Sequence, residues 1–197
     1  MRSAIVIGSV LALAMSAALP AAAANRSDSG FVFHGSPMPE PNIEGGGNGC
    51  PPGVVIASLP FADPGTTCDN TNTITNYSSA ACLANLNFPY PGPNAIYQVT
   101  LAAGNNVAFS ADLTGSTGDL ALFLLTTCGN GATCVDTSQD AIGPGTGPED
   151  IAAASYTPGT YFVYVDSYYA SGGASCGTYT LNVTGSLPVE LQSFSID

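Results

Sequence analysis

Apolar and polar residues alternate in short runs over much of the chain, and Gly, Pro, Asn and Ser separate these runs. The clearest runs lie within residues 159–183, on either side of a Ser/Gly loop. Each run places three apolar side chains on one face: Tyr161, Val163 and Val165 in the first, and Tyr179, Leu181 and Val183 in the second. Period-2 alternation is typical of half-buried antiparallel strands. We therefore expect two strands around this loop.

Similar runs predict further strands, at residues 54–59, 96–101, 107–113, 120–125, 151–155 and 189–196. Residues 120–125 are almost continuously apolar, which indicates a central strand covered on both faces. The turn at residues 103–106 has the composition of a hairpin turn, so we expect the strands on its two sides to pair. No stretch predicts a convincing helix. Short strands separated by Gly, Pro and Asn turns favour an all-β, antiparallel β-sandwich.

The first 24 residues have the features of a secretory signal peptide. Arg2 supplies the positive charge, residues 4–19 form an apolar run, and residues 21–24 offer A-x-A cleavage. The alternative is a membrane anchor, but the run is shorter than the roughly 20 residues that a spanning helix needs. We expect cleavage, no membrane insertion afterwards, and a location outside a bacterial cell or at its surface.

Three regions are expected after the leader. Residues 25–49 are rich in Gly, Pro and Ser, which predicts a flexible arm or linker. The only apolar spot of this arm, residues 31–33, is expected to pack on the domain or to pair with an edge strand. The sandwich is expected over residues 50–185, and residues 186–197 form a tail that adds an extra strand.

The charge of the chain excludes several partners. It has 14 acidic and two basic residues, a formal net charge of −12, and both basic residues are arginines. Nucleic acid is excluded because phosphate binding needs Lys and Arg to release counterions, and anionic membrane surfaces are excluded by the same sign argument. The acidity suits solubility outside the cell; the alternative is cation binding by a few of these acids.

Six cysteines suit an oxidising compartment and predict disulfides. Cys128 and Cys134 flank a short loop between apolar strands, so we expect a hairpin-closing bond between them. For the rest we expect one bond across the long loop and one between the two ends of the domain, which pairs Cys68 with Cys82 and Cys50 with Cys176. Other connectivities of these four stay open. A zinc cluster is not expected, because no C-x-x-C pair occurs and the only histidine, His34, is far from any cysteine.

Three segments in order resemble the bacterial pre-peptidase C-terminal domain. They are GPNAIYQVTL at residues 92–101, GDLALFLL at residues 118–125, and residues 149–183 with the phrases PGTYFVYVD and GTYTLNV. The resemblance spans residues 50–185 and implies a jelly-roll-like β-sandwich. It also implies a secreted appendage that assists secretion, solubility or attachment to substrate. A related group, the collagen-binding domains of bacterial collagenases, binds fibrous substrate and calcium. Asn94 departs from the pattern, since an Asp is common there.

Calcium is the one ion that the sequence favours, because hard oxygen ligands are abundant. The best cluster contains Glu40, Asn42 and Glu44, and it resembles the Glu-Pro-Asn opening of the same family, whose leading acidic residues help to hold the metal in calcium-binding relatives. Asp63 or Asp69 would complete the shell. The alternative is a solvated acidic linker. Two further acids, Asp119 and Asp166, are interpreted as turn-capping residues at strand ends.

The sequence offers little for catalysis. A catalytic triad would have to use His34, which lies in the expected arm. Glu149 and Asp150 are the closest carboxylate pair, but neighbours on a strand point to opposite faces. The glycine-rich run at residues 143–148 lacks lysine and is interpreted as a turn, not a phosphate loop. We therefore expect no enzyme.

Tyr168 and Tyr169 are the best candidates for ligand contact, because tyrosine offers a rigid apolar ring with a polar tip. The alternative is that one ring packs against the sandwich while the other is merely exposed. These observations predict a secreted, non-catalytic module that binds an extracellular polymer, or a protein or glycan at the cell surface. One alternative is a self-assembling subunit of an extracellular matrix or fibre, in which residues 31–33 or 189–196 add a strand to a neighbour. Another is a calcium-stabilised accessory domain that aids the secretion or solubility of partner enzymes.

Overall fold

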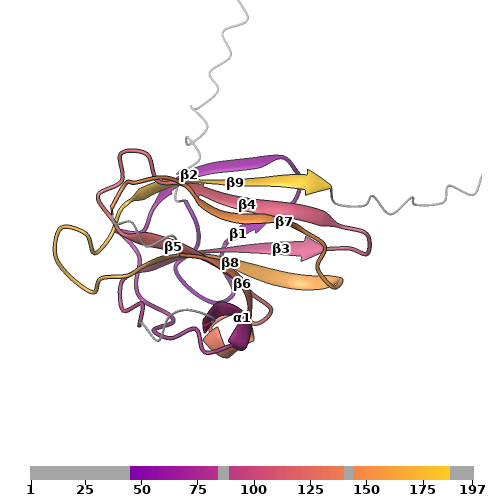
Figure 1. The fold of residues 1–197 in the computed structure, drawn as a ribbon, viewed down its shortest axis with the longest axis horizontal. Helices are drawn as coiled ribbons and strands as arrows, with labels where there is room; N and C mark the ends of the chain where they lie inside the picture. Colours follow the sequence, from indigo (N-terminus) through magenta and orange to yellow (C-terminus); the bar gives the residue numbers. More distant parts are fainter. Residues whose placement is uncertain (1–44, 84–88, 140–143, 187–197) are drawn as a thin grey trace, which may run out of the picture. The chain divides into compact units, whose positions relative to one another are not determined.

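Two β-sheets face each other in the computed structural model, which describes residues 45–83, 89–139 and 144–186 (Figure 1). The chain divides into Met1–Glu40 and Pro41–Asp197, and every described residue belongs to the second unit. The five-stranded sheet has the order β1 (Val54–Ile56), β3 (Asn94–Leu101), β8 (Gly159–Ser167), β5 (Leu120–Leu125) and β6 (Cys134–Ser138). The four-stranded sheet has the order β2 (Phe61–Thr66), β9 (Thr178–Ser186), β4 (Asn106–Asp112) and β7 (Glu149–Ala154).

The predicted all-β sandwich is confirmed. Every strand pairing is antiparallel except that of β1 with β3. Strand β2 was not predicted because it contains Pro64 and Gly65, which weaken a strand pattern; at the edge of a sheet a proline is tolerated. A helix of four residues, α1 (Ala80–Leu83), and a 3₁₀ turn, η1 (Gly131–Thr133), were not predicted either. The strand expected at residues 189–196 lies outside the described residues.

The predicted hairpin at residues 103–106 is wrong. Strand β3 belongs to the five-stranded sheet and β4 to the four-stranded one, so the turn between them crosses from sheet to sheet. Buried Asn105 holds this crossing, because its amide nitrogen donates to the carbonyl oxygens of Ala102 (2.7 Å) and Tyr156 (2.8 Å). Strands β8 and β9 are divided between the sheets in the same way. Consecutive strands therefore lie in opposite sheets, except for β5 and β6, which pair with each other.

The core between the sheets contains the two apolar sets that the alternation predicted. The inward side chains of β8 and β9 are all buried in one cluster: Tyr161, Val163, Val165, Tyr179, Leu181 and Val183. The hydroxyl groups of Tyr97 and Tyr179 lie 3.0 Å apart inside this cluster, and Tyr97 also donates to Asp63 at 3.0 Å. The tyrosines thus bury their rings and still satisfy their polar tips.

Strand β5 is buried on both faces, as predicted. Leu120, Leu122 and Leu124 face the core between the sheets. Ala121, Phe123 and Leu125 face the other way, into a second cluster beneath a long segment that we call the strap, residues 67–91 apart from 84–88. The strap contributes Ile74, Tyr77, Cys82 and Tyr90 to this second cluster. The Tyr77 ring stacks on Phe123 with centroids 3.6 Å apart. The outer face of the five-stranded sheet is therefore covered by a segment whose only regular element is α1.

All three predicted disulfides are wrong. The observed bonds join Cys50 to Cys128, Cys68 to Cys176 and Cys82 to Cys134. The loop between β5 and β6 needs no bond of its own, because Asn130 caps η1 by accepting from the Ala132 amide. Two of the observed bonds instead fasten the strap, one at its start and one at α1. The third joins the segment before β1 to the loop after β5.

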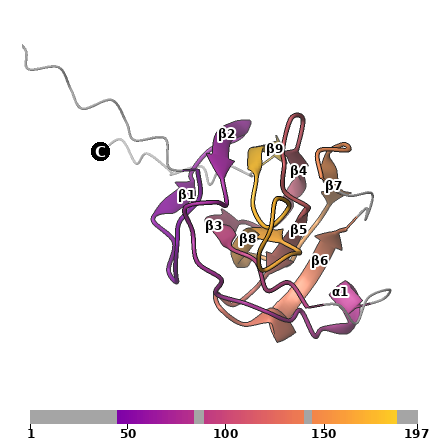
Figure 2. The same cartoon turned by 90° about the vertical axis from the view of Figure 1, so that its left-hand side faces the viewer.

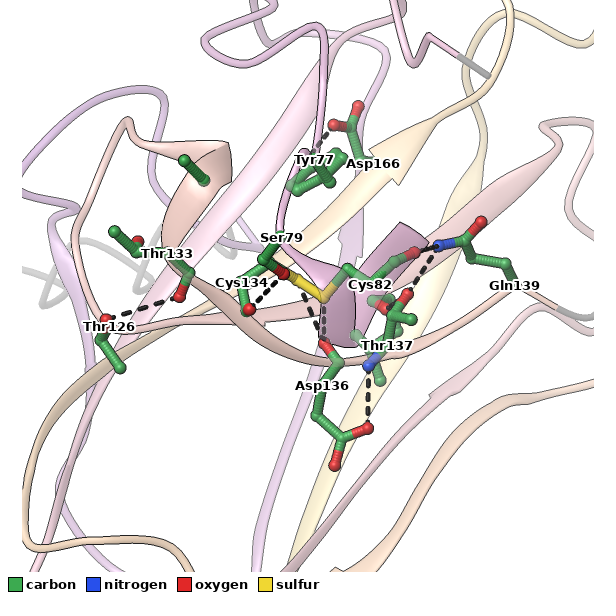
Figure 3. Close-up of a disulfide and its surroundings, with 12 residues drawn as sticks. Tyr77, Ser79, Cys82, Thr126, Thr133, Cys134, Asp136, Thr137, Gln139 and Asp166 are labelled. Carbon is green, nitrogen blue, oxygen red and sulfur yellow. Dashed lines mark hydrogen bonds between the residues drawn. A yellow bond between two sulfur atoms is a disulfide. The ribbon is translucent and has the colours of Figure 1, made fainter. Parts of the chain in front are cut away.

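Figure 3 shows how α1 is held against β6. Beside the Cys82–Cys134 bond, the Ser79 hydroxyl donates to the Cys134 carbonyl oxygen. The Gln139 amide nitrogen donates to the Cys82 carbonyl oxygen at 3.4 Å and to the Thr137 hydroxyl at 3.0 Å. These contacts cover the free side of β6, which is an edge strand.

The other edge strands are protected as well. Strand β1 has only three residues, β2 carries Pro64, and the register of β7 shifts at a bulge opposite β4. Short strands, prolines and bulges are the usual devices that keep sheet edges from pairing with other chains. All four edges of the described sheets therefore resist strand addition.

Residues 45–47, predicted as part of the flexible arm, pack against the sandwich. Gly47 forms an antiparallel bridge with Ile96, and the Tyr179 hydroxyl donates to the Gly45 carbonyl oxygen at 3.0 Å. A side chain at Gly45 would place its Cβ only 2.1 Å from the Cα of Gly65, and Gly46 has a φ of +70°. These glycines permit close approach of two backbones and do not act as a flexible linker.

The predicted leader, residues 1–24, and the arm around residues 31–33 lie outside the described residues. Within residues 45–83, 89–139 and 144–186, no helix is both long and apolar enough to cross a membrane.

We predict that Gly45→Ala lowers the free energy of unfolding by about 1–3 kcal/mol, because the added methyl group would overlap the backbone of β2. Chemical denaturation of the mature protein measures the change. Gly173→Ala is the matched control, since a Cβ there meets nothing within 4 Å. Equal stability of the two variants would contradict the close packing of residues 45–47.

Candidate functional site

Several loops meet at one end of the sandwich, which we call the loop end (Figure 2). The start of the strap is joined to the segment before β9 by the Cys68–Cys176 disulfide and by the Thr67 amide, which donates to the Gly177 carbonyl oxygen at 3.0 Å. The Tyr168 amide donates to the Asp119 carbonyl oxygen at 2.9 Å. The loop between β8 and β9 is thus tied to the loop before β5, and the loop end is cross-linked by main-chain bonds.

The structure places both predicted ligand-contact residues at the loop end. Tyr169 is 44% exposed, one of three large hydrophobic side chains that are exposed in the described residues. Its ring meets Tyr168 edge to face at 4.8 Å, and Tyr168 in turn meets Tyr90 of the strap at 5.4 Å. One ring is therefore packed and the other presented to solvent.

A continuous series of rings supports Tyr169 from within. Tyr90 meets Phe123 edge to face at 4.9 Å, and Phe123 is the ring on which Tyr77 stacks. Sequence reasoning missed Tyr77 and Tyr90 because the strap has no periodicity. The only signal for them is the presence of aromatic residues in an otherwise polar loop. The exposed tyrosine is thus the outer end of a packed aromatic series and not an isolated surface residue.

Beneath these rings lies a buried carboxylate, Asp166, which was predicted to cap a turn. That prediction is wrong: Asp166 lies within β8, is completely buried, and accepts hydrogen bonds from the Tyr77 hydroxyl and from the Ser167 amide (2.7 Å). Burial raises its pKa well above the usual value, and the bonds from Tyr77 and Ser167, with the adjacent Asn94 side chain, offset part of the rise. The described residues contain no Lys, Arg or His that could pair with it.

Asp119, predicted to cap a turn as well, lies just before β5. Its main chain ties loops together, since its amide donates to the Ala174 carbonyl oxygen at 3.2 Å. Burial raises the pKa of its carboxyl group. Two hydroxyl groups extend the buried polar network around Asp166. Those of Thr67 and Ser167 lie 3.0 Å apart, and the Thr67 hydroxyl accepts from the Gly177 amide at 3.1 Å. Thr67 and Ser167 are completely buried, and no motif of the sequence indicated them.

The proposed calcium ligands Glu40, Asn42 and Glu44 lie outside the described residues. Of the two acids expected to complete the shell, Asp63 accepts from Tyr97, whereas Asp69 lines a pocket of about 450 Å³. Residues 45–48, Thr66 and Asn70 also line this pocket. No group of three or more His, Cys, Asp or Glu side chains that could hold a metal is found among the described residues.

The paired carboxylates behave as the strand pattern predicted. Glu149 is buried and accepts from the Ser138 hydroxyl at 2.6 Å, whereas Asp150 is exposed. The two side chains therefore lie on opposite faces of β7 and do not converge on one substrate. His34 lies outside the described residues.

Comparison with solved structures finds the pre-peptidase C-terminal domain of collagenase from Bacillus anthracis. The sequences are 17% identical, the match covers 66% of this chain and 93% of that one, and the TM-score is 0.42. This is the family that the three sequence segments resemble. No family model matches the chain, and no curated protein is similar to it.

We predict that the mature protein loses stability as the pH rises above the ordinary pKa of an aspartate, because the unfolded chain then ionises Asp166 while the folded protein keeps it protonated. The contribution of protonated Asp166 to the free energy of unfolding is fully present below that pKa. It decreases as the pH rises, until the pH exceeds the raised pKa of the folded state. Asp166→Asn keeps the site neutral at every pH. The free energy of unfolding of this variant, relative to that of wild type, should therefore rise by about 1.4 kcal/mol per pH unit across this window.

Thermal and urea unfolding between acid and neutral pH measures this difference. Asp150→Asn removes an exposed carboxylate and should keep the pH profile of the wild type. If Asp166→Asn has the same pH dependence of stability as wild type, Asp166 is not the group that causes it.

Proposed function

We propose that this chain is a secreted, non-catalytic β-sandwich module that attaches to an extracellular polymer or a cell-surface component through its loop end. The observation that carries the proposal is the exposed ring of Tyr169, held edge to face on Tyr168. A ring that is already ordered loses little conformational entropy on binding, which is why rigid tyrosines are effective contact residues.

The charge of the domain limits the class of polymer that it could bind. Its described surface carries carboxylates and no basic side chain, so an anionic polymer would be repelled. A tyrosine ring offers an apolar face for a sugar ring or a prolyl side chain, and its hydroxyl group remains free for a polar contact. Neutral glycans and fibrous proteins fit this combination.

The protected edges favour this module over a self-assembling fibre. Growth by strand addition needs an open edge, and each edge strand of the described sheets is short, kinked, covered or proline-bearing. The tail and the arm that would supply the added strand lie outside the described residues.

We predict that Tyr169→Ala weakens retention on the target polymer at least about tenfold, which corresponds to about 1.4 kcal/mol, without changing the melting temperature. Pull-down on collagen, chitin, cellulose and peptidoglycan identifies the target and measures the loss. Val55→Ala, which truncates an exposed apolar side chain on β1, is the matched control and should bind like wild type. Equal retention of both variants, or no retention of wild type on any of the four polymers, would contradict the proposal.

Calcium-dependent stabilisation is a second proposal, and the pocket beside residues 45–48 supports it. Asp69 and Asn70 line this pocket, and carboxylate and amide oxygens are hard ligands that Ca²⁺ prefers. Glu44 directly precedes the lining residues 45–48 in the chain. Bound calcium would supply positive charge to a domain that lacks basic residues.

Measuring the melting temperature at increasing calcium concentrations tests this proposal. A site should raise the free energy of unfolding by about 2.7 kcal/mol when free calcium is about 100 times the dissociation constant, and EDTA should reverse the gain. Asp69→Asn should reduce the gain, whereas Asp150→Asn should keep it. A midpoint that is the same in calcium and in EDTA would exclude the site.

A further inference from the structure

A carboxylate without a cation lies at the loop end, beside the aromatic series that ends at Tyr169. Asp119 is partly exposed, and burial raises the pKa of its carboxyl group with no hydrogen bond or cation from the described residues to offset the rise. Residues 45–83, 89–139 and 144–186 contain no Lys, Arg or His that could pair with it. Any cation that meets this partly desolvated charge therefore comes from elsewhere.

The strand register places this carboxylate next to Tyr168. The last pair of the β5–β8 ladder at the loop end is Leu120 with Ser167. One step further, the Tyr168 amide donates to the Asp119 carbonyl oxygen at 2.9 Å, so these two residues lie directly opposite each other. Opposite residues of an antiparallel pair project to the same side, with Cβ atoms about 4.5–5.5 Å apart. This side is the one that the strap covers, because Tyr168 packs on the second cluster.

The charge of Asp119 also acts on a second ring. Burial raises the pKa of Tyr90, and the Asp119 carboxylate raises it further. Tyr90 meets Tyr168 edge to face at 5.4 Å, and Tyr168 meets Tyr169 in the same way at 4.8 Å. The carboxylate therefore lies beside a group of three tyrosine rings, and the outermost of them is open to solvent.

A carboxylate next to tyrosine rings fits a planar cation. Cations are attracted to the faces of aromatic rings, and carboxylates form their strongest hydrogen bonds with charged donors. A guanidinium group can make both contacts at once, because it is flat, weakly hydrated and carries five N–H donors in a fixed plane. The ammonium group of lysine is a strongly hydrated point charge and stacks less well. Arginine is therefore the side chain that this arrangement fits best.

We propose that the loop end binds an arginine side chain of a partner protein, with its guanidinium group paired to Asp119 and stacked on the ring of Tyr169. The site rests on the proposed function and narrows the target to a protein that exposes arginine. The net charge of the chain supports this choice, because a formal charge of −12 attracts basic segments and raises their rate of association.

Titration of the mature protein with short blocked peptides tests the site. One peptide carries a single arginine between glycines, the second carries citrulline, which removes the charge and nearly keeps the shape, and the third carries lysine. Binding is followed by the NMR shifts of the backbone amides of residues 167–177, at a salt concentration that limits the Debye length to about 8 Å. The arginine peptide should bind at least about tenfold more tightly than the citrulline peptide and more tightly than the lysine peptide.

Asp119→Asn should weaken binding of the arginine peptide about tenfold, because it removes the charge that pairs with the guanidinium group. Its melting temperature should equal or exceed that of wild type, since the lost charge is partly desolvated. Tyr169→Leu, which keeps an apolar side chain but has no ring face, should also weaken binding. Asp150→Asn removes the same charge from an exposed position of β7 and should bind like wild type.

Equal affinity of the two aspartate variants for the arginine peptide would overturn the site. So would equal affinity of wild type for the arginine and citrulline peptides, and equal affinity for arginine and lysine would overturn the preference for a guanidinium group. Tighter binding of the arginine peptide by Arg26→Gln would overturn the partner protein, because the chain's own arginine would then be the occupant.

Pull-down on the four polymers separates this site from the proposed function. If retention depends on Tyr169 but is the same in Asp119→Asn as in wild type, attachment through the loop end stands and the arginine site is overturned. If the arginine peptide binds through Asp119 while none of the four polymers retains wild type, the arginine site stands and attachment to those polymers does not.

Discussion

Burial of strand β5 on both faces is the constraint on which the rest of this domain depends. Leu120, Leu122 and Leu124 face the four-stranded sheet, while Phe123 and Leu125 face away from it. Each such side chain contributes about 1.5–3 kcal/mol when it is buried, so neither face can stay exposed without a large loss. The second sheet covers one face. The other face needs the strap, which packs Ile74, Tyr77 and Tyr90 onto it.

The strap has no strand ladder to hold it, and this explains where the covalent and polar contacts lie. Its start is joined to Cys176, its helix to Cys134, and its centre to Asp166 through Tyr77. A buried carboxylate without a cation is costly, and here donors from Tyr77 and Ser167 compensate part of that cost. The same contacts hold the aromatic series that ends at Tyr169. The contacts that hold the strap over the five-stranded sheet are therefore also the ones that position the exposed ring of Tyr169.

Local patterns predicted the faces of the strands well. Alternation selected the inward residues of β8 and β9, and the continuous apolar run identified β5 as doubly covered, because both signals arise within a few residues. Other features were not predicted from the sequence. Three consecutive glycines at residues 45–47 have the composition of a linker, yet Gly45 has no room for a side chain beside the backbone of β2, some 20 positions away. The polar strap carries aromatic residues at no regular spacing, so its role as a cover could not be recognised.

By itself, the sequence determined the sandwich class, the buried face of each main strand, and the acidic composition of the chain. These properties depend on residue type and on neighbours two positions apart. Only the tertiary structure decided which sheet each strand joins, which cysteines pair, and that Asp166 is buried beneath the strap instead of capping a turn. The reason is physical: a cysteine's partner or a carboxylate's burial is set by residues up to 108 positions away, and no local pattern carries that information.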